Sequence, residues 1–193
     1  MGALKQIEQS KPPEGYRPID YYIRNSSDRM AITQGMYIDY DAAKQVIDFI
    51  EALTVQTGRL QGKPFKLLDW QKHDFIVPVF GWKRANGLRR FSEVFSILPK
   101  KNGKTVLTAG IALYFLIGNG RNSETYSLAS DQQQAALIYT DMERFINANA
   151  ELKKLCKPVP STKRVRCEAL GSTYRSLSAD SKNKDGPNAS LII

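Results

Sequence analysis

One stretch of the sequence restricts the possible folds of this chain more than any other. Residues 91–98 are rich in Phe, Val and Ile, residues 99–103 are polar, and residues 104–117 form a longer apolar run. A short run of aromatic and β-branched residues predicts a buried strand, whereas the longer run predicts a helix. A strand, a polar turn and a helix in this order form the unit from which parallel α/β sheets are built.

The chain after this unit continues the alternation. Residues 124–129 predict a second strand, and residues 131–148 predict a helix with one apolar side. Residues 163–169 predict a third strand, residues 174–177 a fourth short element, and residues 189–193 the beginning of another apolar strand. Strands that alternate with helices predict a parallel sheet with helices on both faces.

The first part of the chain has a different character. Residues 1–38 are interrupted by Pro and Gly and indicate loops, whereas apolar residues between Asp41 and Gly58 recur at helical spacing. We therefore expect an N-terminal helical and loop segment over residues 1–60, followed by the α/β core over residues 61–193.

A short helix is predicted at residues 70–77, early in the expected core. Asp69 can cap its N-terminus, and Pro78, which lacks a backbone N–H group, bends or ends it. Trp70 is expected to pack in the core rather than to stack on a base. The single histidine, His73, has no evident partner in the sequence and is expected to be structural.

The net charge of the chain is +9, and its basic residues are clustered. Residues 83–104 contain seven basic residues and one acid, and residues 151–184 contain nine basic residues and three acids. Such clusters favour a polyanionic partner, such as nucleic acid or a ligand with several phosphates, although a solvated surface explains either cluster as well.

The composition excludes several classes of protein. Two cysteines and one histidine provide neither a zinc site nor a disulfide framework. The N-terminus lacks the apolar core of a signal peptide, and the longest apolar stretch, residues 111–117, is too short to span a bilayer. We therefore expect a protein of a reducing cytoplasm without a membrane segment.

The turn before the long helix has the properties of a phosphate-binding loop. Such a loop directs backbone N–H groups at phosphate oxygens and adds a lysine and a magnesium-binding hydroxyl. Asn102 and Gly103 can adopt the positive φ angles that this requires. Lys104 is then the candidate phosphate ligand and Thr105 the candidate magnesium ligand, at a helix N-terminus that also attracts anions. Leu98 replaces the first glycine of G-x-x-x-x-G-K-[ST], and an ordinary basic turn is the alternative.

With these motifs in order, the chain resembles the ATPase domain of the large terminase subunit of tailed phages. Residues 67–71 (Leu-Leu-Asp-Trp-Gln) resemble the adenine-recognising segment of that family. Residues 87–105 resemble the deviant Walker A motif of one large branch, which also lacks the first glycine but has arginine where this chain has Lys100. Residues 129–135 resemble the strand end and helix start that follow.

The resemblance extends to the end of the chain and covers residues 60–193. Residues 177–182 and 185–190 resemble the approach to a Walker B motif. The family implies an Asp-Glu pair directly after Ile193, which would bind magnesium and activate water, and a nuclease domain beyond it. Without these groups and the central strands, we expect weak nucleotide binding, little or no turnover and self-association from this chain.

The resemblance implies an ATP hydrolase that uses ATP and Mg²⁺ to package viral DNA into a procapsid. It implies double-stranded DNA, a small terminase subunit, a portal protein and further copies in a homo-oligomeric ring as partners, in the cytoplasm of an infected bacterium. Lys104 is the implied catalytic residue, and Thr105 is the implied Mg²⁺ ligand. The implied ATP-binding residues are Gln71, Pro99, Lys100, Lys101, Asn102, Gly103, Lys104 and Thr105.

Some assignments remain open from the residues alone. An arginine finger from a neighbouring subunit is expected in a ring motor, and its candidates are Arg84, Arg89, Arg90 and Arg144. Asp131 is better explained as a helix cap than as a catalytic residue. Two other functions compete with the packaging motor: a helicase-like P-loop ATPase, and a non-catalytic basic module that grips nucleic-acid phosphates.

Overall fold

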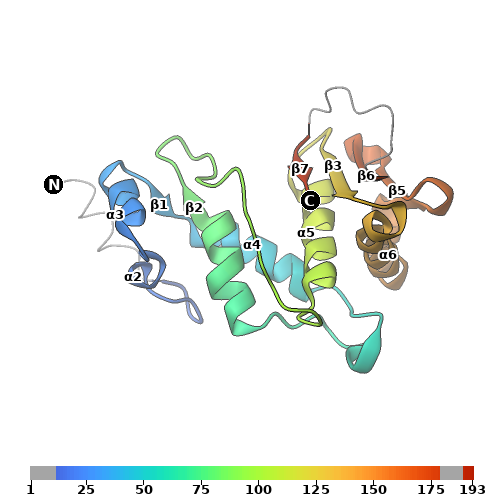
Figure 1. Ribbon diagram of the computed structural model, residues 1–193, viewed down its shortest axis with the longest axis horizontal. Coiled ribbons are helices and arrows are strands. Elements are labelled where there is room, and N and C mark those ends of the chain that lie inside the picture. Colours follow the sequence, from blue (N-terminus) through green and yellow to red (C-terminus); the bar gives the residue numbers. More distant parts are fainter. Residues whose placement is uncertain (1–11, 179–188) are drawn as a thin grey trace. The chain divides into compact units, whose positions relative to one another are not determined.

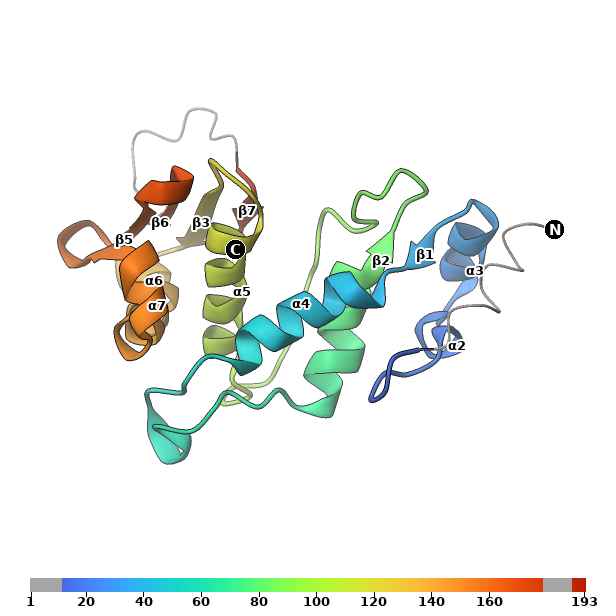
Figure 2. The same cartoon turned by 180° about the vertical axis from the view of Figure 1, so that it is seen from behind.

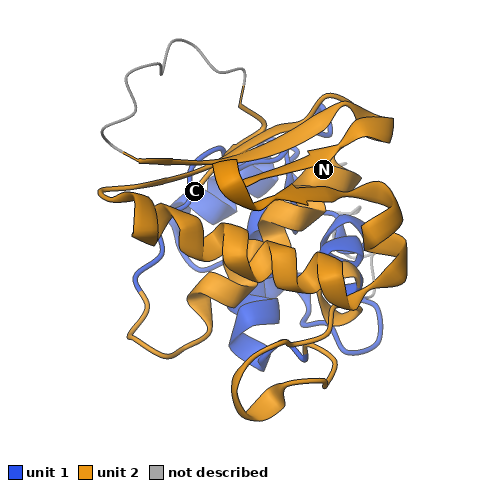
Figure 3. Cartoon of the chain, turned by 90° about the vertical axis from the view of Figure 1, so that its right-hand side faces the viewer, with its two compact units in different colours: residues 1–48, 66–97 blue, residues 49–65, 98–193 orange. Residues whose placement is uncertain are grey.

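The computed structural model of the chain describes residues 12–178 and 189–193 (Figure 1). The chain divides into two compact units (Figure 3). Residues 1–48 and 66–97 form the first unit, and residues 49–65 and 98–193 form the second. In the part of the chain that the structure describes, no helix is long and apolar enough to cross a membrane.

The first unit is mainly helical. Its elements are α2 (Ile19–Tyr22), α3 (Ser26–Thr33), β1 (Tyr37–Ile38), the beginning of α4 (Tyr40–Glu51), η2 (Gln71–Gly81) and β2 (Trp82–Lys83). The two short strands β1 and β2 pair antiparallel. The predicted helix after Asp41 is confirmed, but it ends at Glu51. Beyond it the backbone turns to form an isolated bridge between Thr54 and Pro64 instead of a further helical turn.

Helix η2 differs from the predicted short helix in two respects. It continues through Pro78 to Gly81 because it is a wider π-type helix, in which each N–H bonds to the carbonyl five residues earlier. Pro78 has no N–H group to bond to the carbonyl of His73, and the Arg24 guanidinium donates to that carbonyl instead, at 3.4 Å. The predicted cap is wrong: among the described residues no side chain caps η2, and the Asp69 carboxylate contacts Arg17 at 3.4 Å.

The second unit contains a five-stranded sheet in the order β4-β5-β6-β3-β7. Its strands are β3 (Glu124–Ala129), β4 (Lys157–Val159), β5 (Arg164–Cys167), β6 (Ser172–Ser178) and β7 (Leu191–Ile192). Strands β6, β3 and β7 are parallel, as predicted, whereas β4 and β5 form an antiparallel hairpin on the β6 side. The sheet is therefore mixed, and β4 was not predicted because its three residues include Pro158.

Three helices accompany this sheet, namely α5 (Lys104–Gly118), α6 (Gln132–Ala148) and α7 (Ala150–Leu155). Both long helices agree with the prediction, and Asp131 caps α6 by accepting a hydrogen bond from the Gln134 N–H at 2.8 Å. Helices α5 and α6 pack on each other and on β3 and β6, so they cover the same face of the sheet (Figures 2 and 3). The alternation of strands and helices in the sequence had predicted helices on both faces of the sheet, whereas α5 and α6 lie on one.

The core of the second unit is formed by the apolar sides of these helices. Leu113, Leu116, Met142 and Ile146 are fully buried. The end of α4 also packs on α5, and a Cβ atom at Gly110 would lie 3.3 Å from Ile50. This close approach explains why a glycine is suited to the middle of an otherwise apolar helix.

The strand predicted at residues 91–98 is wrong. Within the described residues this segment forms no strand, and Phe95 and Ile97 are 90% and 82% exposed. A β-prone run becomes a strand only where a neighbouring strand accepts its hydrogen bonds, and the observed sheet order does not include this segment. The loop that follows is therefore anchored by helix α5 rather than by a preceding strand.

Candidate nucleotide-binding site

The loop before α5 alternates between backbone conformations. Lys101 and Gly103 both have φ = 69°, in the left-handed region. The prediction had placed positive φ angles at Asn102 and Gly103, and it is wrong for Asn102. That side chain instead donates to the carbonyl oxygens of Pro99 and Lys100 at 3.3 and 3.5 Å. Alternation of left-handed and other residues turns backbone N–H groups toward one side, which is the geometry of an anion-binding nest.

The N-terminus of α5 is open to a ligand. Gly103 occupies the cap position, its carbonyl accepts from the Leu107 N–H at 3.0 Å, and among the described residues no side chain caps the first turn. The N–H groups of this turn have no partner within a helix, and the helix dipole gives them a partial positive charge. This end of α5 can therefore accept phosphate oxygens without displacing a protein group.

The lysines of the loop add charge to this opening. Lys100, Lys101 and Lys104 are all exposed, and no carboxylate of the described residues forms an ion pair with them. Thr105, on the first turn of α5, is partly buried. Within the described residues there is no group of three His, Cys, Asp or Glu side chains that could hold a metal ion.

Gln71, the predicted adenine-recognising residue, belongs to the first unit, and the loop belongs to the second. Its side chain is 3% exposed, and its amide oxygen accepts a hydrogen bond from the Leu68 N–H at 2.9 Å. The side-chain amide is therefore held in one orientation by the turn that starts η2. Trp70, expected in the core, is only partly buried.

The prediction that His73 is structural agrees with its surroundings. Its Nδ1 atom lies 3.0 Å from the buried Tyr22 hydroxyl, and its Nε2 atom lies 3.6 Å from Asp69. Burial lowers the pKa of His73, and the Asp69 carboxylate opposes that shift only in part. Burial also raises the pKa of Tyr22. No local pattern in the sequence indicates this cluster, because its members come from distant segments.

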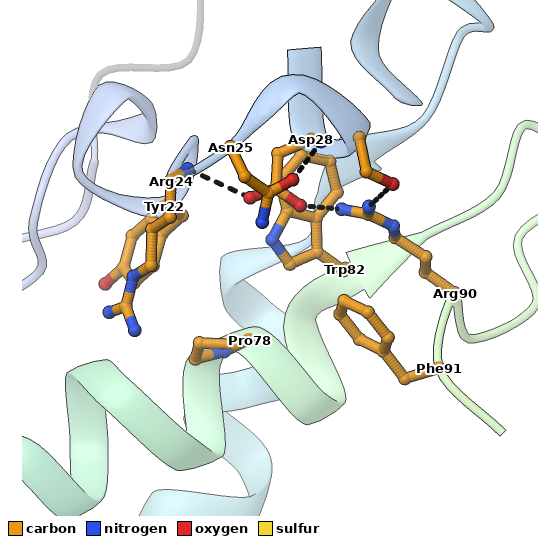
Figure 4. Close-up of a pocket in the computed structure, with 9 residues that line it drawn as sticks. Tyr22, Arg24, Asn25, Asp28, Pro78, Trp82, Arg90 and Phe91 are labelled. Carbon is orange, nitrogen blue, oxygen red and sulfur yellow. Dashed lines mark hydrogen bonds and ion pairs between the residues drawn. The ribbon is translucent and has the colours of Figure 1, made fainter. Parts of the chain in front are cut away.

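Three of the four arginine-finger candidates have contacts within their own unit. Arg90 bonds to Asp28 at 2.7 Å and stacks on Trp82, with its guanidinium carbon 4.6 Å from the ring centroid. It lines a pocket of about 270 Å³ in the first unit (Figure 4). These contacts engage the Arg90 guanidinium within the first unit. Arg84 donates to the Arg90 carbonyl at 3.4 Å, and Arg144 pairs with Asp141 at 3.0 Å.

The approach to the expected Walker B motif is described only at its ends. Residues 179–182 and 185–188 of the two predicted motifs lie outside the described residues. Leu191 and Ile192 form β7, which pairs parallel with Thr125 and Tyr126 of β3. The prediction of a further parallel strand at the end of this sequence is therefore confirmed.

The chain is similar to large subunits of phage terminases. A family model described as the ATPase domain of the terminase large subunit matches residues 69–193. The large terminase subunit of Enterobacteria phage HK97 is 33% identical over 153 residues, which is 78% of this chain and 29% of that protein.

A solved structure agrees with the sequence match. The crystal structure of the HK97 bacteriophage large terminase has a TM-score of 0.65 and 30% identity, and the match covers 78% of this chain and 30% of that chain. The chain thus spans less than a third of the length of these relatives. The range matched by the family model, residues 69–193, contains Gln71, the loop at residues 98–105 and β7. The chain belongs to the family of terminase large subunit ATPase domains.

Proposed function

We propose that this chain binds ATP through residues 98–105 and forms the nucleotide-binding part of a motor that packages viral DNA. The observation that carries the proposal is the backbone of the loop, with left-handed residues at 101 and 103 immediately before the uncapped helix α5. Backbone N–H groups in this arrangement favour an anion with several oxygens. Family membership supports adenosine triphosphate as that anion.

Each loop residue has a distinct role in this proposal. Lys104 binds the β- and γ-phosphates, and Lys100 and Lys101 add positive charge around them. Pro99 and Asn102 shape the loop, the latter through its two hydrogen bonds to backbone carbonyls. The Thr105 hydroxyl would hold a bound Mg²⁺ ion, which neutralises charge on the transferring phosphate when it is present.

Gln71 is proposed to select adenine. A glutamine amide both accepts and donates a hydrogen bond, which matches the amino group and the ring nitrogen on one edge of adenine. The bond from Leu68 occupies one of the two lone pairs of the amide oxygen. Because this bond also fixes the rotamer, little side-chain entropy is lost when a base binds.

The motor function and its partners are proposed for a protein of the full length of these relatives. In such a protein, ATP hydrolysis drives double-stranded DNA through a homo-oligomeric ring that works with a portal protein and a small terminase subunit, in the cytoplasm of an infected bacterium. The chain's net charge of +9 suits a partner with many phosphates.

The phosphate role is tested by titrating the chain with a fluorescent ATP analogue in the presence of Mg²⁺. Lys104→Ala is expected to weaken binding about tenfold or more, since a charge-assisted hydrogen bond contributes about 1.5–3 kcal/mol. Lys153→Ala is the matched control, because Lys153 is an exposed lysine of α7. Binding that is absent, or equal in the two variants, would refute the proposed phosphate role.

The base selectivity is tested with Gln71→Glu. Glutamate keeps an acceptor for the Leu68 N–H group but loses the amide donor, so it leaves the local turn intact. We expect the preference for ATP over GTP to fall, with the affinity for inorganic triphosphate unchanged. A preference that stays the same would show that Gln71 does not contact the base.

A further inference from the structure

The two cysteines of the chain lie on neighbouring strands of the second unit. Cys167 is the last residue of β5, and Cys156 directly precedes β4 with an extended backbone (φ −120°, ψ 135°). Strands β4 and β5 pair antiparallel with Lys157 opposite Arg166, so the next pair along the same ladder is Cys156 and Cys167. Side chains directly opposite each other in a ladder point to the same face, so the two thiols are cross-strand neighbours.

The backbone hydrogen bonds of the hairpin favour a close approach of this pair. In an antiparallel ladder, hydrogen-bonded pairs alternate with non-hydrogen-bonded pairs, whose Cα atoms are only about 4.5 Å apart. Pro158 has no N–H group, and the Cys156 N–H donates to the Leu152 carbonyl oxygen at 2.8 Å rather than to β5. Residues 156 and 158 therefore occupy non-hydrogen-bonded positions. Since the Cα atoms of a disulfide are usually about 4.4–6.8 Å apart, Cys156 and Cys167 can be bridged with little movement of either strand.

The surroundings of the pair favour a disulfide over a metal site. Cys156 and Cys167 are free thiols that are 1% and 0% exposed. Among the described residues no group of three His, Cys, Asp or Glu side chains could hold a metal ion, so the pair lacks the further ligands of a structural zinc site. Two adjacent thiols without such ligands have oxidation to a disulfide as their characteristic reaction.

The position of the hairpin in the sheet gives a route to these buried thiols. Strand β4 has three residues and lies at the edge of the sheet, in the order β4-β5-β6-β3-β7. A short edge strand, paired on one side only, opens locally at a lower free energy than the whole domain. Local opening exposes Cys156 to solvent and allows its thiol to ionise, which the nucleophilic step requires.

We propose that Cys156 and Cys167 form a reversible redox site, which a low-molecular-weight disulfide such as oxidised glutathione converts into a cross-strand disulfide. The thiolate of one cysteine attacks a sulfur of oxidised glutathione, whose S–S bond breaks and releases one glutathione thiolate. The second cysteine then attacks the protein sulfur of the mixed disulfide and releases the other glutathione. The chain loses two electrons and two thiol protons, and one molecule of oxidised glutathione becomes two molecules of the reduced form.

The disulfide would connect the end of α7 to the end of β5 and hold the edge hairpin closed. In a reducing compartment the pair stays as two thiols, so the site responds to the ratio of thiol to disulfide in its surroundings. A closed loop of this length stabilises the folded chain mainly by restricting the unfolded chain. The proposal does not involve the loop before α5 and is independent of nucleotide binding.

The test compares the reduced and oxidised forms of the complete 193-residue chain. Because the pair is buried, incubation with oxidised glutathione is expected to take hours. Mass spectrometry after alkylation should then show a monomer that is lighter than the reduced chain by two hydrogen atoms and in which Cys156 is linked to Cys167. Its melting temperature should exceed that of the reduced chain by roughly 5–10 °C, and dithiothreitol should reverse the rise.

Single variants serve as controls. Cys156→Ala and Cys167→Ala each keep a small apolar side chain, should take up at most one glutathione, and should show no rise in melting temperature after the same treatment. The main comparison uses two redox forms of one sequence, so it does not depend on the stability of either variant. Absence of reaction, glutathione adducts on both cysteines, a disulfide between two chains, or a lower melting temperature of the internally linked form would each overturn the proposal.

Discussion

The guanidinium of Arg90 donates a hydrogen bond to Oδ1 of Asp28 at 2.7 Å, and the two side chains are only 10% and 9% exposed. The other carboxylate oxygen of Asp28 accepts from the Arg24 N–H at 2.9 Å. Arg90 also stacks on Trp82, which is fully buried. The pair joins α3 to the residues after β2, 62 positions later in the chain, and thereby fixes one side of the pocket in Figure 4.

Removing one member of this pair should destabilise the chain strongly. Arg90→Ala leaves the Asp28 carboxylate buried without its cation, and such a loss costs about 3–5 kcal/mol. Arg17→Ala is the matched control in the same unit, because the pair of Arg17 with Asp69 is exposed and contributes at most about 1 kcal/mol. Urea unfolding measures both. A similar loss in the two variants would mean that burial of the Arg90 pair is not what gives it its effect.

Local patterns in the sequence were sufficient for α4, α5, α6 and β3, whereas α2 and α3, which lie where loops were expected, and α7 were not predicted. The apolar runs at residues 104–117 and 131–148 form α5 and α6, since helical hydrogen bonds lie within one segment. The run at residues 91–98 is as β-prone as residues 124–129, but a strand also needs a partner, and partners are not encoded locally. The same reason explains why the β4–β5 hairpin was missed.

The candidate site shows the same limit. The position of the loop and the start of its helix follow from local chemistry, and both were predicted. The positive φ angle predicted at Asn102 is found at Lys101 instead, and this was not predicted. The Asn102 side-chain amide holds the loop by donating to the Pro99 and Lys100 carbonyl oxygens. The contact of His73 with Tyr22 joins residues 51 positions apart and cannot be read from either neighbourhood.

Stability is expected to fall as the pH drops below about 6.5. Burial lowers the pKa of His73 in the folded chain below its ordinary value of 6.5, so the unfolded chain takes up a proton first as the pH falls. The stability that depends on neutral His73 is therefore fully present above pH 6.5. It is lost as the pH decreases toward the pKa of His73 in the folded chain, by at most about 1.4 kcal/mol per pH unit.

The single histidine makes this prediction specific. The difference in unfolding free energy between pH 7.5 and pH 5.5 should be smaller in His73→Gln than in the wild-type chain, since the carboxylates are common to both. Comparison of the two differences by urea unfolding isolates the histidine. Equal differences in the two chains would show that His73 titrates alike in the folded and unfolded states.

The two cysteines should be unreactive in the folded chain. Cys156 and Cys167 are free and buried, and burial, followed by the neighbouring Cys167, raises the pKa of Cys156 to about 12. Because the thiolate is the reactive form, a disulfide reagent at pH 8 should label both thiols slowly in buffer and rapidly in denaturant. Rapid stoichiometric labelling of the folded chain would indicate that the β4–β5 hairpin opens readily.

The alternating conformation of the phosphate loop predicts opposite effects for two substitutions. Lys101 has a side chain in the left-handed region, which costs about 1 kcal/mol, so Lys101→Gly should stabilise the chain by roughly 0.5–1 kcal/mol. Gly103 has the same φ without that cost, and Gly103→Ala should destabilise by about 1–2 kcal/mol. Thermal unfolding without nucleotide measures both effects.

The same two variants test whether a bound ATP analogue needs the left-handed backbone at both positions. If it does, Lys101→Gly should still bind the analogue, weakened only by the loss of one positive charge, and Gly103→Ala should not bind it. Destabilisation by both substitutions, or by neither, would show that residues 101 and 103 do not hold these conformations in solution.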